Sequence, residues 1–106
     1  MNDAVKKQIE DYLTKNKVMV FMKGTPDRPQ CGFSKAVVDV LTLHDVSFGY
    51  CNILEDPDMR QGIKEYADWP TIPQVYINKE FVGGCDIVLE LNNSGELEKM
   101  LEKIKS

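Results

Sequence analysis

The residues most able to do chemistry in this 106-residue chain are four consecutive ones, Cys31-Gly32-Phe33-Ser34. A strand-like apolar run and a loop precede them, and apolar residues at helical spacing follow, so the thiol of Cys31 is predicted at the start of a helix. A second cysteine in place of Ser34 would complete a Cys-x-x-Cys redox pair. With serine there, Cys31 cannot close that local disulfide, and one thiol remains for mixed disulfides or for metal.

The predicted position of Cys31 favours its ionised form. Unpaired N–H groups and the dipole at a helix N-terminus lower a thiol pKa from about 8.5 into a range of about 3.5 to 7.5. Lys23, just upstream, would add positive charge near the same sulfur. Two alternatives stay open: Cys31 could be a buried small hydrophobic residue, and Lys23 could be a solvated lysine at the end of a strand.

Hydrophobic spacing predicts alternating helices and strands around this thiol. Helices are expected from Asn2 or Asp3 to about residue 17, from Cys31 to about residue 45, from Asp56 to about residue 67, and after caps at Asp86 and Ser94. Strands are expected over residues 18–22, 46–54, 74–77 and 80–82, the last two as a hairpin. One βαβ unit followed by a hairpin predicts an α/β fold, with a small four-stranded mixed sheet and helices on both faces.

Length and composition limit the class of protein. The chain is 42% hydrophobic, which is enough to bury one core without disulfides and favours a single domain over residues 1–106. Its 17 Asp and Glu against 13 Lys and Arg give a net charge of -4, which offers no general attraction for nucleic acid or anionic membrane.

No segment approaches the roughly 18 apolar residues of a membrane-spanning helix, and no signal-peptide core is visible. The three cysteines favour reduced thiols in a reducing compartment. A soluble protein of a bacterial cytoplasm is expected, with a processed mitochondrial matrix form as the alternative.

Four motifs in order and at compatible spacings resemble the signature blocks of the monothiol glutaredoxins with a Cys-Gly-Phe-Ser site. The motifs are Met22-Lys23-Gly24-Thr25-Pro26, Pro29-x-Cys31-Gly32-Phe33-Ser34, Trp69-Pro70-Thr71-Ile72-Pro73-Gln74 and Phe81-Val82-Gly83-Gly84-Cys85-Asp86. The resemblance covers nearly the whole chain. It implies a single glutaredoxin domain with a thioredoxin-like fold, a glutathione site, and a homodimer that holds a [2Fe-2S] cluster for delivery to apo iron-sulfur proteins and assembly factors.

The number of available ligands agrees with a shared cluster. A [2Fe-2S] cluster normally takes four thiolates, whereas this chain has only Cys31, Cys51 and Cys85, with no tight ligand spacing. Two chains giving one Cys31 each, with two glutathione thiolates, would complete the set and make cluster binding dimeric. A structural zinc site is disfavoured because the chain has no Cys-x-x-Cys and no paired histidine. The sole histidine, His44, is expected at a helix end, near its carbonyl groups.

The resemblance assigns the glutathione contacts to four segments. Lys23 and Arg60 match the positions that bind the glycyl carboxylate, with Lys64 as a weaker addition, and arginine suits a carboxylate through its bidentate fork. In the segment Thr71-Ile72-Pro73, the resemblance implies a cis Pro73 that leaves the Ile72 main chain free to pair with a peptide. An ordinary proline-rich loop is the alternative there.

The fourth segment is Gly84-Cys85-Asp86, at a strand end that leads into a helix. Glycine allows close approach of a ligand, N–H groups at the helix start would take the second carboxylate, and Asp86 would pair with the ligand's amino group. A simple capped turn is the alternative. Cys85 could form a disulfide with Cys31 if their Cα atoms lie within about 7 Å. Cys51 is expected to be a buried, inert thiol, and Trp69, Phe81 and Phe48 are expected in the core.

Three functions remain open at this point. The first is a carrier that holds a cluster between two chains and passes it on. The second is a glutathione-dependent reductase of protein-glutathione mixed disulfides that works through Cys31 alone, and the third is an inactive thioredoxin-like adaptor. The missing resolving thiol and the loop over residues 25–30, long enough to alter the approach to Cys31, favour the carrier, with weak oxidoreductase activity at most.

Overall fold

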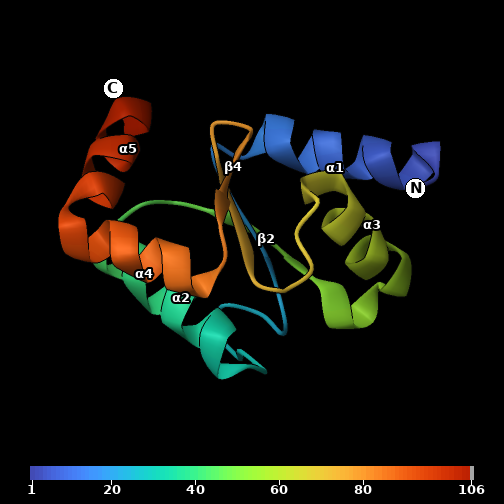
Figure 1. Cartoon of the computed structure of the whole chain (residues 1–106), viewed down its shortest axis with the longest axis horizontal. Helices are drawn as coiled ribbons and strands as arrows, with labels where there is room; N and C mark the ends of the chain where they lie inside the picture. The colour runs from blue at the N-terminus through green and yellow to red at the C-terminus, as the bar shows by residue number, and fades with distance from the viewer. Residues whose placement is uncertain (106) are drawn as a thin grey trace.

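The computed structural model describes residues 1–105, and its helices and strands follow one another in the predicted order (Figure 1). The helices are α1 (Asp3–Lys15), α2 (Gly32–Leu43), α3 (Pro57–Ala67), α4 (Cys85–Ser94) and α5 (Glu96–Lys105), with a short 3-10 helix η1 (Ile53–Glu55). The strands are β1 (Val18–Met22), β2 (Gly49–Asn52), β3 (Gln74–Ile77) and β4 (Glu80–Gly83).

The four strands form one mixed sheet in the order β2-β1-β3-β4. Strand β2 runs parallel to β1, with Val20 opposite Tyr50. Strand β3 is antiparallel to β1, with Val20 opposite Val75, and β4 is antiparallel to β3. The predicted four-stranded mixed sheet, built from a βαβ unit and a hairpin, is therefore confirmed.

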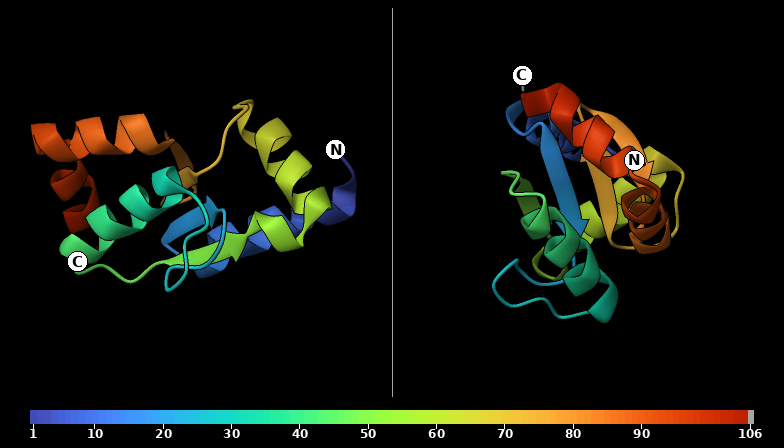
Figure 2. Two further views of the ribbon diagram at one scale, coloured as in Figure 1. Left: turned by 90° about the horizontal axis from the view of Figure 1, so that it is seen from below. Right: turned by 90° about the vertical axis from the view of Figure 1, so that its left-hand side faces the viewer.

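Two hydrophobic clusters lie on opposite faces of this sheet. All five residues of β1 are buried, and they alternate between the clusters, because successive strand side chains point to opposite faces. Val18, Val20 and Met22 pack in the cluster of α2, α4 and α5, while Met19 and Phe21 pack in the cluster of α1 and α3. Figures 1 and 2 show these two groups of helices on either side of the sheet.

Capping side chains fix where two of the helices begin. The Asn2 side chain accepts a hydrogen bond from Val5 N at 2.8 Å at the start of α1, and the Asp56 side chain accepts one from Met59 N at 3.0 Å at the start of α3. Pro57 occupies the first turn of α3, where its missing N–H costs nothing. These starts agree with the sequence prediction.

Several predicted boundaries are wrong, and the strand expected over residues 46–54 differs most. It is ordered as a strand only over β2, because the Asn52 side chain accepts hydrogen bonds from Gly24 N and Leu54 N and turns the chain into η1. Helix α1 ends at Lys15 instead of residue 17, α2 covers residues 32–43, and β4 extends through Gly83.

The caps of the last two helices also differ from the prediction. Gly84 is the N-cap of α4, so Asp86 lies in the first turn of the helix, where a negative charge still favours the dipole. Ser94 is the last residue of α4, and its hydroxyl accepts from Glu96 N at 3.4 Å beyond the left-handed Gly95.

Helix α2 is held at the end that lies far from Cys31. His44 does follow the last turn of α2, as predicted, but its ring pairs with a side chain and not with helix carbonyls: Nε2 lies 2.7 Å from Asn92 Oδ1 on α4. Lys105 Nζ of α5 donates to the His44 carbonyl at 3.1 Å. These contacts tie α2 to both neighbouring helices.

Candidate functional site

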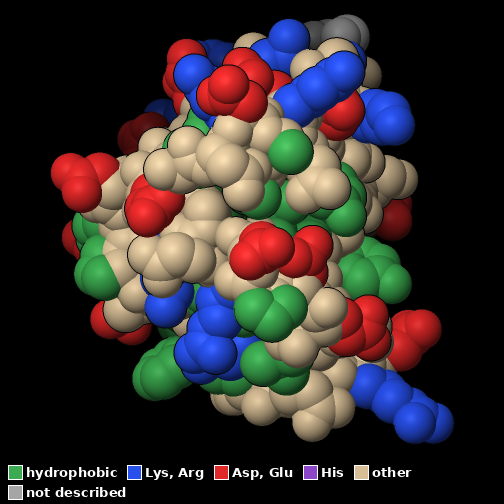
Figure 3. All heavy atoms as spheres, turned by 90° about the vertical axis from the view of Figure 1, so that its right-hand side faces the viewer, with side chains coloured by type: hydrophobic (Ala, Val, Ile, Leu, Met, Phe, Trp, Pro, Cys, Tyr) green, Lys and Arg blue, Asp and Glu red, His purple; other side chains and the backbone are tan. Residues whose placement is uncertain are grey.

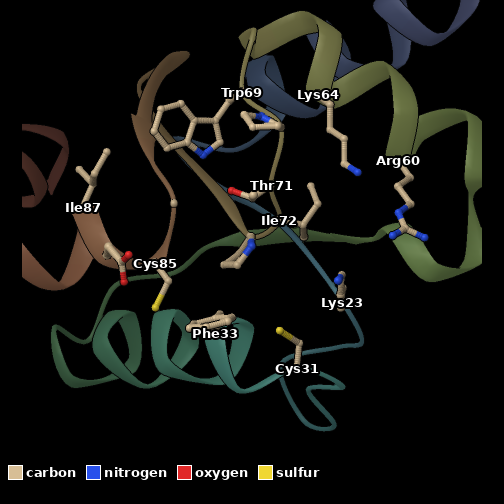
Figure 4. A pocket seen from close by; sticks show the side chains of 14 residues that line it. Lys23, Cys31, Phe33, Arg60, Lys64, Trp69, Thr71, Ile72, Cys85 and Ile87 are labelled. Atoms are coloured by element: carbon tan, nitrogen blue, oxygen red, sulfur yellow. The ribbon is translucent and has the colours of Figure 1, made fainter.

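A pocket of about 510 Å³ lies beside Cys31, where five segments of the chain meet (Figure 4). Every site residue named from the sequence lines it: Lys23, Cys31, Arg60, Lys64, Thr71, Ile72, Pro73, Gly84, Cys85 and Asp86. The segments are the end of β1, the start of α2, one side of α3, the loop before β3 and the start of α4. The structure therefore brings all of these residues together, while their individual roles remain predictions.

Cys31 is the N-cap residue of α2, and it is partly exposed. Its pKa lies below the usual value of a thiol, chiefly because the Ser34 N–H donates to the sulfur. The Phe33 N–H, the charge of Lys23 and the Ser34 hydroxyl act in the same direction, against partial burial. The predicted position of Cys31 at the start of a helix is confirmed, the lowered pKa agrees with the predicted activation, and the alternative of a buried Cys31 is wrong.

Ser34 has a direct role in this arrangement, beyond the absence of a second thiol. Its side chain is fully buried, and Oγ accepts a hydrogen bond from Lys23 N at 3.1 Å. Ser34 Oγ accepts this bond through a lone pair, so the hydroxyl proton stays available to the Cys31 sulfur. The hydrogen bond from the Ser34 hydroxyl is among the causes of the lowered pKa of Cys31. Ser34 thus links the end of the central strand to the sulfur of Cys31.

We expect Ser34→Ala to raise the pKa of Cys31 and to slow its alkylation near neutral pH. A hydrogen bond to a charged group contributes about 1.5 kcal/mol at the lower end, so the rate should fall by about tenfold. The raised pKa leaves less thiolate at neutral pH, whereas both proteins are fully ionised at alkaline pH and their rates should converge there. Alkylation rates measured across the pH range test this, and equal rates at neutral pH would show that the hydroxyl does not stabilise the sulfur.

The other two cysteines are buried. Burial, the nearby Asp86 carboxylate and Cys31 raise the pKa of Cys85, which is 8% exposed at the start of α4. Cys51 lies in the cluster of α1 and α3, where burial is the main cause of its raised pKa. All three cysteines are free thiols in this structure. The prediction of a buried Cys51 is confirmed, and Cys31 is the most accessible thiol.

Positive charge lines one end of the pocket. Lys23, Arg60 and Lys64 contribute to its wall, and none of them takes part in the ion pairs found among residues 1–105. On the face of the molecule that contains α3, Lys and Arg side chains gather beside hydrophobic ones (Figure 3). These cations are therefore available to an anionic ligand.

The loop before β3 presents its main chain to the pocket. The peptide bond between Ile72 and Pro73 is cis, as the resemblance implied. Within residues 1–105, no protein group is hydrogen-bonded to the Ile72 main chain. Gly84, at the start of α4, lies close to this loop. A Cβ atom on Gly84 would lie 3.3 Å from Pro73 O and 3.4 Å from Trp69 Nε1, closer than most Cβ contacts, so the absence of a side chain lets α4 begin against the loop.

The loop between β1 and α2 is closed by its own hydrogen bonds. Thr25 and Arg28 exchange main-chain hydrogen bonds of 3.3 and 3.0 Å, and Gln30 N donates to Lys23 O at 2.9 Å. Asn52 Oδ1 accepts from Gly24 N at 2.9 Å and joins the loop to the end of β2. The chain that leads into Cys31 is therefore held on both sides.

Sequence reasoning missed part of the pocket wall. Phe33 fits the apolar spacing of its helix, yet 62% of it is exposed and it lines the pocket, because the first turn of α2 extends beyond the core. Trp69 was expected in the core, but it is half-buried and lines the pocket, with its ring against Phe81 at 5.6 Å. Its place between Asp68 and Pro70, outside any strand, could have indicated this. Phe48 and Phe81 are partly buried against the clusters.

Two features are absent from residues 1–105. No three His, Cys, Asp or Glu side chains lie together as a possible metal site in this part of the chain. None of its helices combines the length and the apolar character needed to cross a membrane.

The mixed sheet with helices on both faces defines a thioredoxin-like fold, and it places one partly exposed thiol with a lowered pKa at the start of α2. The model of the Glutaredoxin family matches residues 18–82, more than half of the chain. An uncharacterized monothiol glutaredoxin of Synechocystis sp. is 57% identical over 102 residues, covering 96% of this chain and 95% of the relative. The chain belongs to the glutaredoxin family, and within it to the monothiol glutaredoxins with a Cys-Gly-Phe-Ser site.

Two further relatives support this assignment. The mitochondrial monothiol glutaredoxin-5 of Saccharomyces cerevisiae is 47% identical over 109 residues, covering 100% of this chain and 73% of the relative. The solution structure of reduced poplar apo GrxS14 is 52% identical, with a TM-score of 0.84, and the match covers 93% of this chain and 91% of the poplar chain. The poplar structure agrees with the predicted thioredoxin-like fold.

Proposed function

We propose that each chain binds one glutathione in the pocket, and that two chains hold a [2Fe-2S] cluster between them for transfer to apo-proteins. The observation that supports this most is the contrast among the thiols: Cys31 is partly exposed with a lowered pKa, while Cys51 and Cys85 are buried with raised ones. A thiolate is the form of cysteine that binds metal.

The pocket suits the chemistry of glutathione from end to end. Lys23, Arg60 and Lys64 would bind the glycyl carboxylate, and the free Ile72 main chain would pair with the cysteinyl residue beside Cys31. The N–H groups at the start of α4 would take the γ-glutamyl carboxylate. The exposed Asp86 carboxylate would pair with the adjacent amino group.

The number of ligands requires a second chain. A [2Fe-2S] cluster takes four thiolates, and the described residues contain one accessible thiol and no group of three metal ligands. Two Cys31 thiolates and two glutathione thiolates complete the set. Because half of these ligands come from a dissociable tripeptide, the cluster would be held at an exposed interface from which it can be released to apo iron-sulfur proteins or assembly factors. The compartment we propose is a bacterial cytoplasm, with a mitochondrial matrix as the alternative.

Anaerobic reconstitution with iron, sulfide and glutathione tests this proposal. We expect visible absorption of a [2Fe-2S] cluster, a dimer by size-exclusion chromatography, and two glutathione molecules per cluster. Omitting glutathione should leave a colourless monomer. A cluster that forms in full without glutathione, or on a monomer, would contradict the proposal.

A second candidate function uses the same thiolate and deserves a direct assay because Cys31 is accessible. The Cys31 thiolate would attack the glutathione sulfur of a protein-glutathione disulfide, releasing the protein thiolate and leaving Cys31 disulfide-bonded to glutathione. A second glutathione thiolate would then free Cys31 and leave as glutathione disulfide. Rapid turnover of a glutathionylated protein by a colourless monomer would favour this reductase over the carrier.

A further inference from the structure

Gln74 is a polar side chain buried directly behind the loop that lines the pocket. It is completely inaccessible to solvent, and both its amide nitrogen and its amide oxygen are hydrogen-bonded. Nε2 donates to Trp69 O at 3.1 Å and to Thr71 O at 3.4 Å, and Oε1 accepts from the Tyr76 hydroxyl at 3.1 Å. A buried amide is costly unless it is hydrogen-bonded, so this full set of partners points to a defined role.

The chemistry of the partners fixes which way the amide faces. Two carbonyl oxygens can only accept, so the NH₂ group must face the loop and the oxygen must face Tyr76. Burial raises the pKa of Tyr76, which is 2% exposed, so its hydroxyl keeps the proton that it donates to Gln74. The Tyr76 ring packs edge-on to Phe21 at 5.6 Å and lies 5.4 Å from Phe81. The loop is thereby connected to the rigid centre of the sheet.

The same hydrogen bonds determine what the loop offers to a ligand. The carbonyls of Trp69 and Thr71 are turned toward the interior and occupied by Gln74. The next residue, Ile72, has no main-chain partner among residues 1–105, and it lies in the pocket wall opposite Cys31 (Figure 4). Of these neighbouring peptide groups, the one at Ile72 is therefore left for an extended peptide.

We propose that Gln74 is a positioning residue for glutathione, which holds the loop so that the Ile72 main chain meets the cysteinyl part of the tripeptide. This inference rests on the proposed glutathione site. It assigns the affinity of the site partly to a side chain that cannot touch the ligand, and it predicts that the two NH₂ donors matter while the Tyr76 hydroxyl matters much less.

Three variants separate the two sides of this amide. Gln74→Glu keeps the shape and the acceptor for Tyr76 but removes both donors, and Gln74→Met removes them without adding a charge that could prevent folding. Tyr76→Phe is the matched control, because it also leaves a buried polar atom without its partner yet keeps both donors to the loop. Each variant is compared with the intact chain by circular dichroism and by calorimetric titration with glutathione.

We expect both Gln74 variants to bind glutathione about tenfold more weakly, which corresponds to one net hydrogen bond's contribution, and Tyr76→Phe to stay within about twofold. The pKa of Cys31, set by groups on α2 and by Lys23, should be the same in all of them. Unchanged affinity in a folded Gln74→Met, or an equal loss in Tyr76→Phe, would overturn the inference while the proposed function stands. Failure of the unmodified protein to bind glutathione would overturn both.

Discussion

Replacing Cys31 by serine should abolish cluster retention while leaving the fold intact. The variant removes the accessible thiolate, and neither buried cysteine can take its place. Serine is a favoured N-cap residue, and its hydroxyl oxygen can accept from the same Ser34 and Phe33 N–H groups that face the Cys31 sulfur. Thermal unfolding should therefore be unchanged or raised slightly, and visible absorption after reconstitution should fall to background.

The matched control for this prediction is Cys85→Ser, because Cys85 lines the same pocket. Its thiol is buried with a raised pKa, so the variant should still form the coloured dimer, although the buried hydroxyl will lower stability somewhat. Full cluster binding by Cys31→Ser, or complete loss in a folded Cys85→Ser, would show that the coordinating sulfur has been assigned wrongly.

Replacing Gly24 by alanine should disrupt the loop that leads into Cys31. Gly24 has a φ of +91°, which favours glycine, and a Cβ atom there would lie 2.5 Å from Arg28 O and 2.6 Å from Gln30 N. Both contacts are with main-chain atoms, so the loop must open and lose its internal hydrogen bonds. We expect a loss of about 1–3 kcal/mol in the free energy of unfolding, the usual cost of such backbone strain.

The site should be affected along with the stability. Once the Gln30–Lys23 hydrogen bond opens, the position of Cys31 relative to Ser34 and Lys23 is no longer fixed. Cluster yield should therefore fall with Gly24→Ala, as measured by reconstitution beside chemical denaturation. Gly32→Ala is the control, because no heavy atom lies within 4 Å of a Cβ there, and its stability should be unchanged or higher. Equal behaviour of the two variants would argue against a structural role for the loop.

The elements that could be predicted are those whose local pattern and tertiary environment agree. The apolar run of β1 predicted a buried strand, and all five of its residues are buried. The apolar run after residue 46 predicted too long a strand, because the Asn52 side chain bonds to Gly24 and Leu54 and ends the ladder, and hydrophobic spacing does not reveal such a contact. Asp86 has the right type for a cap, but the chain turns earlier, at Gly84.

The candidate site also has residues that could be predicted from the sequence and residues that could not. The resemblance named residues from distant parts of the chain, and the structure places all of them around one pocket. It could not show that Phe33 is exposed, because a first-turn residue and a core residue share the same helical spacing. The contribution of Gln74 was also hidden, since its partners are main-chain carbonyls that sequence does not place in space.

The pocket straddles the two hydrophobic clusters. Arg60 and Lys64 come from α3, which packs in the cluster with α1, whereas Cys31 and Cys85 stand at the starts of helices that pack in the other cluster. Any molecule that fills the pocket therefore clamps the two halves of the domain together across the end of the sheet. Ligand binding and the cooperativity of unfolding are therefore thermodynamically linked, because neither half can unfold alone without releasing the ligand that is bound between them.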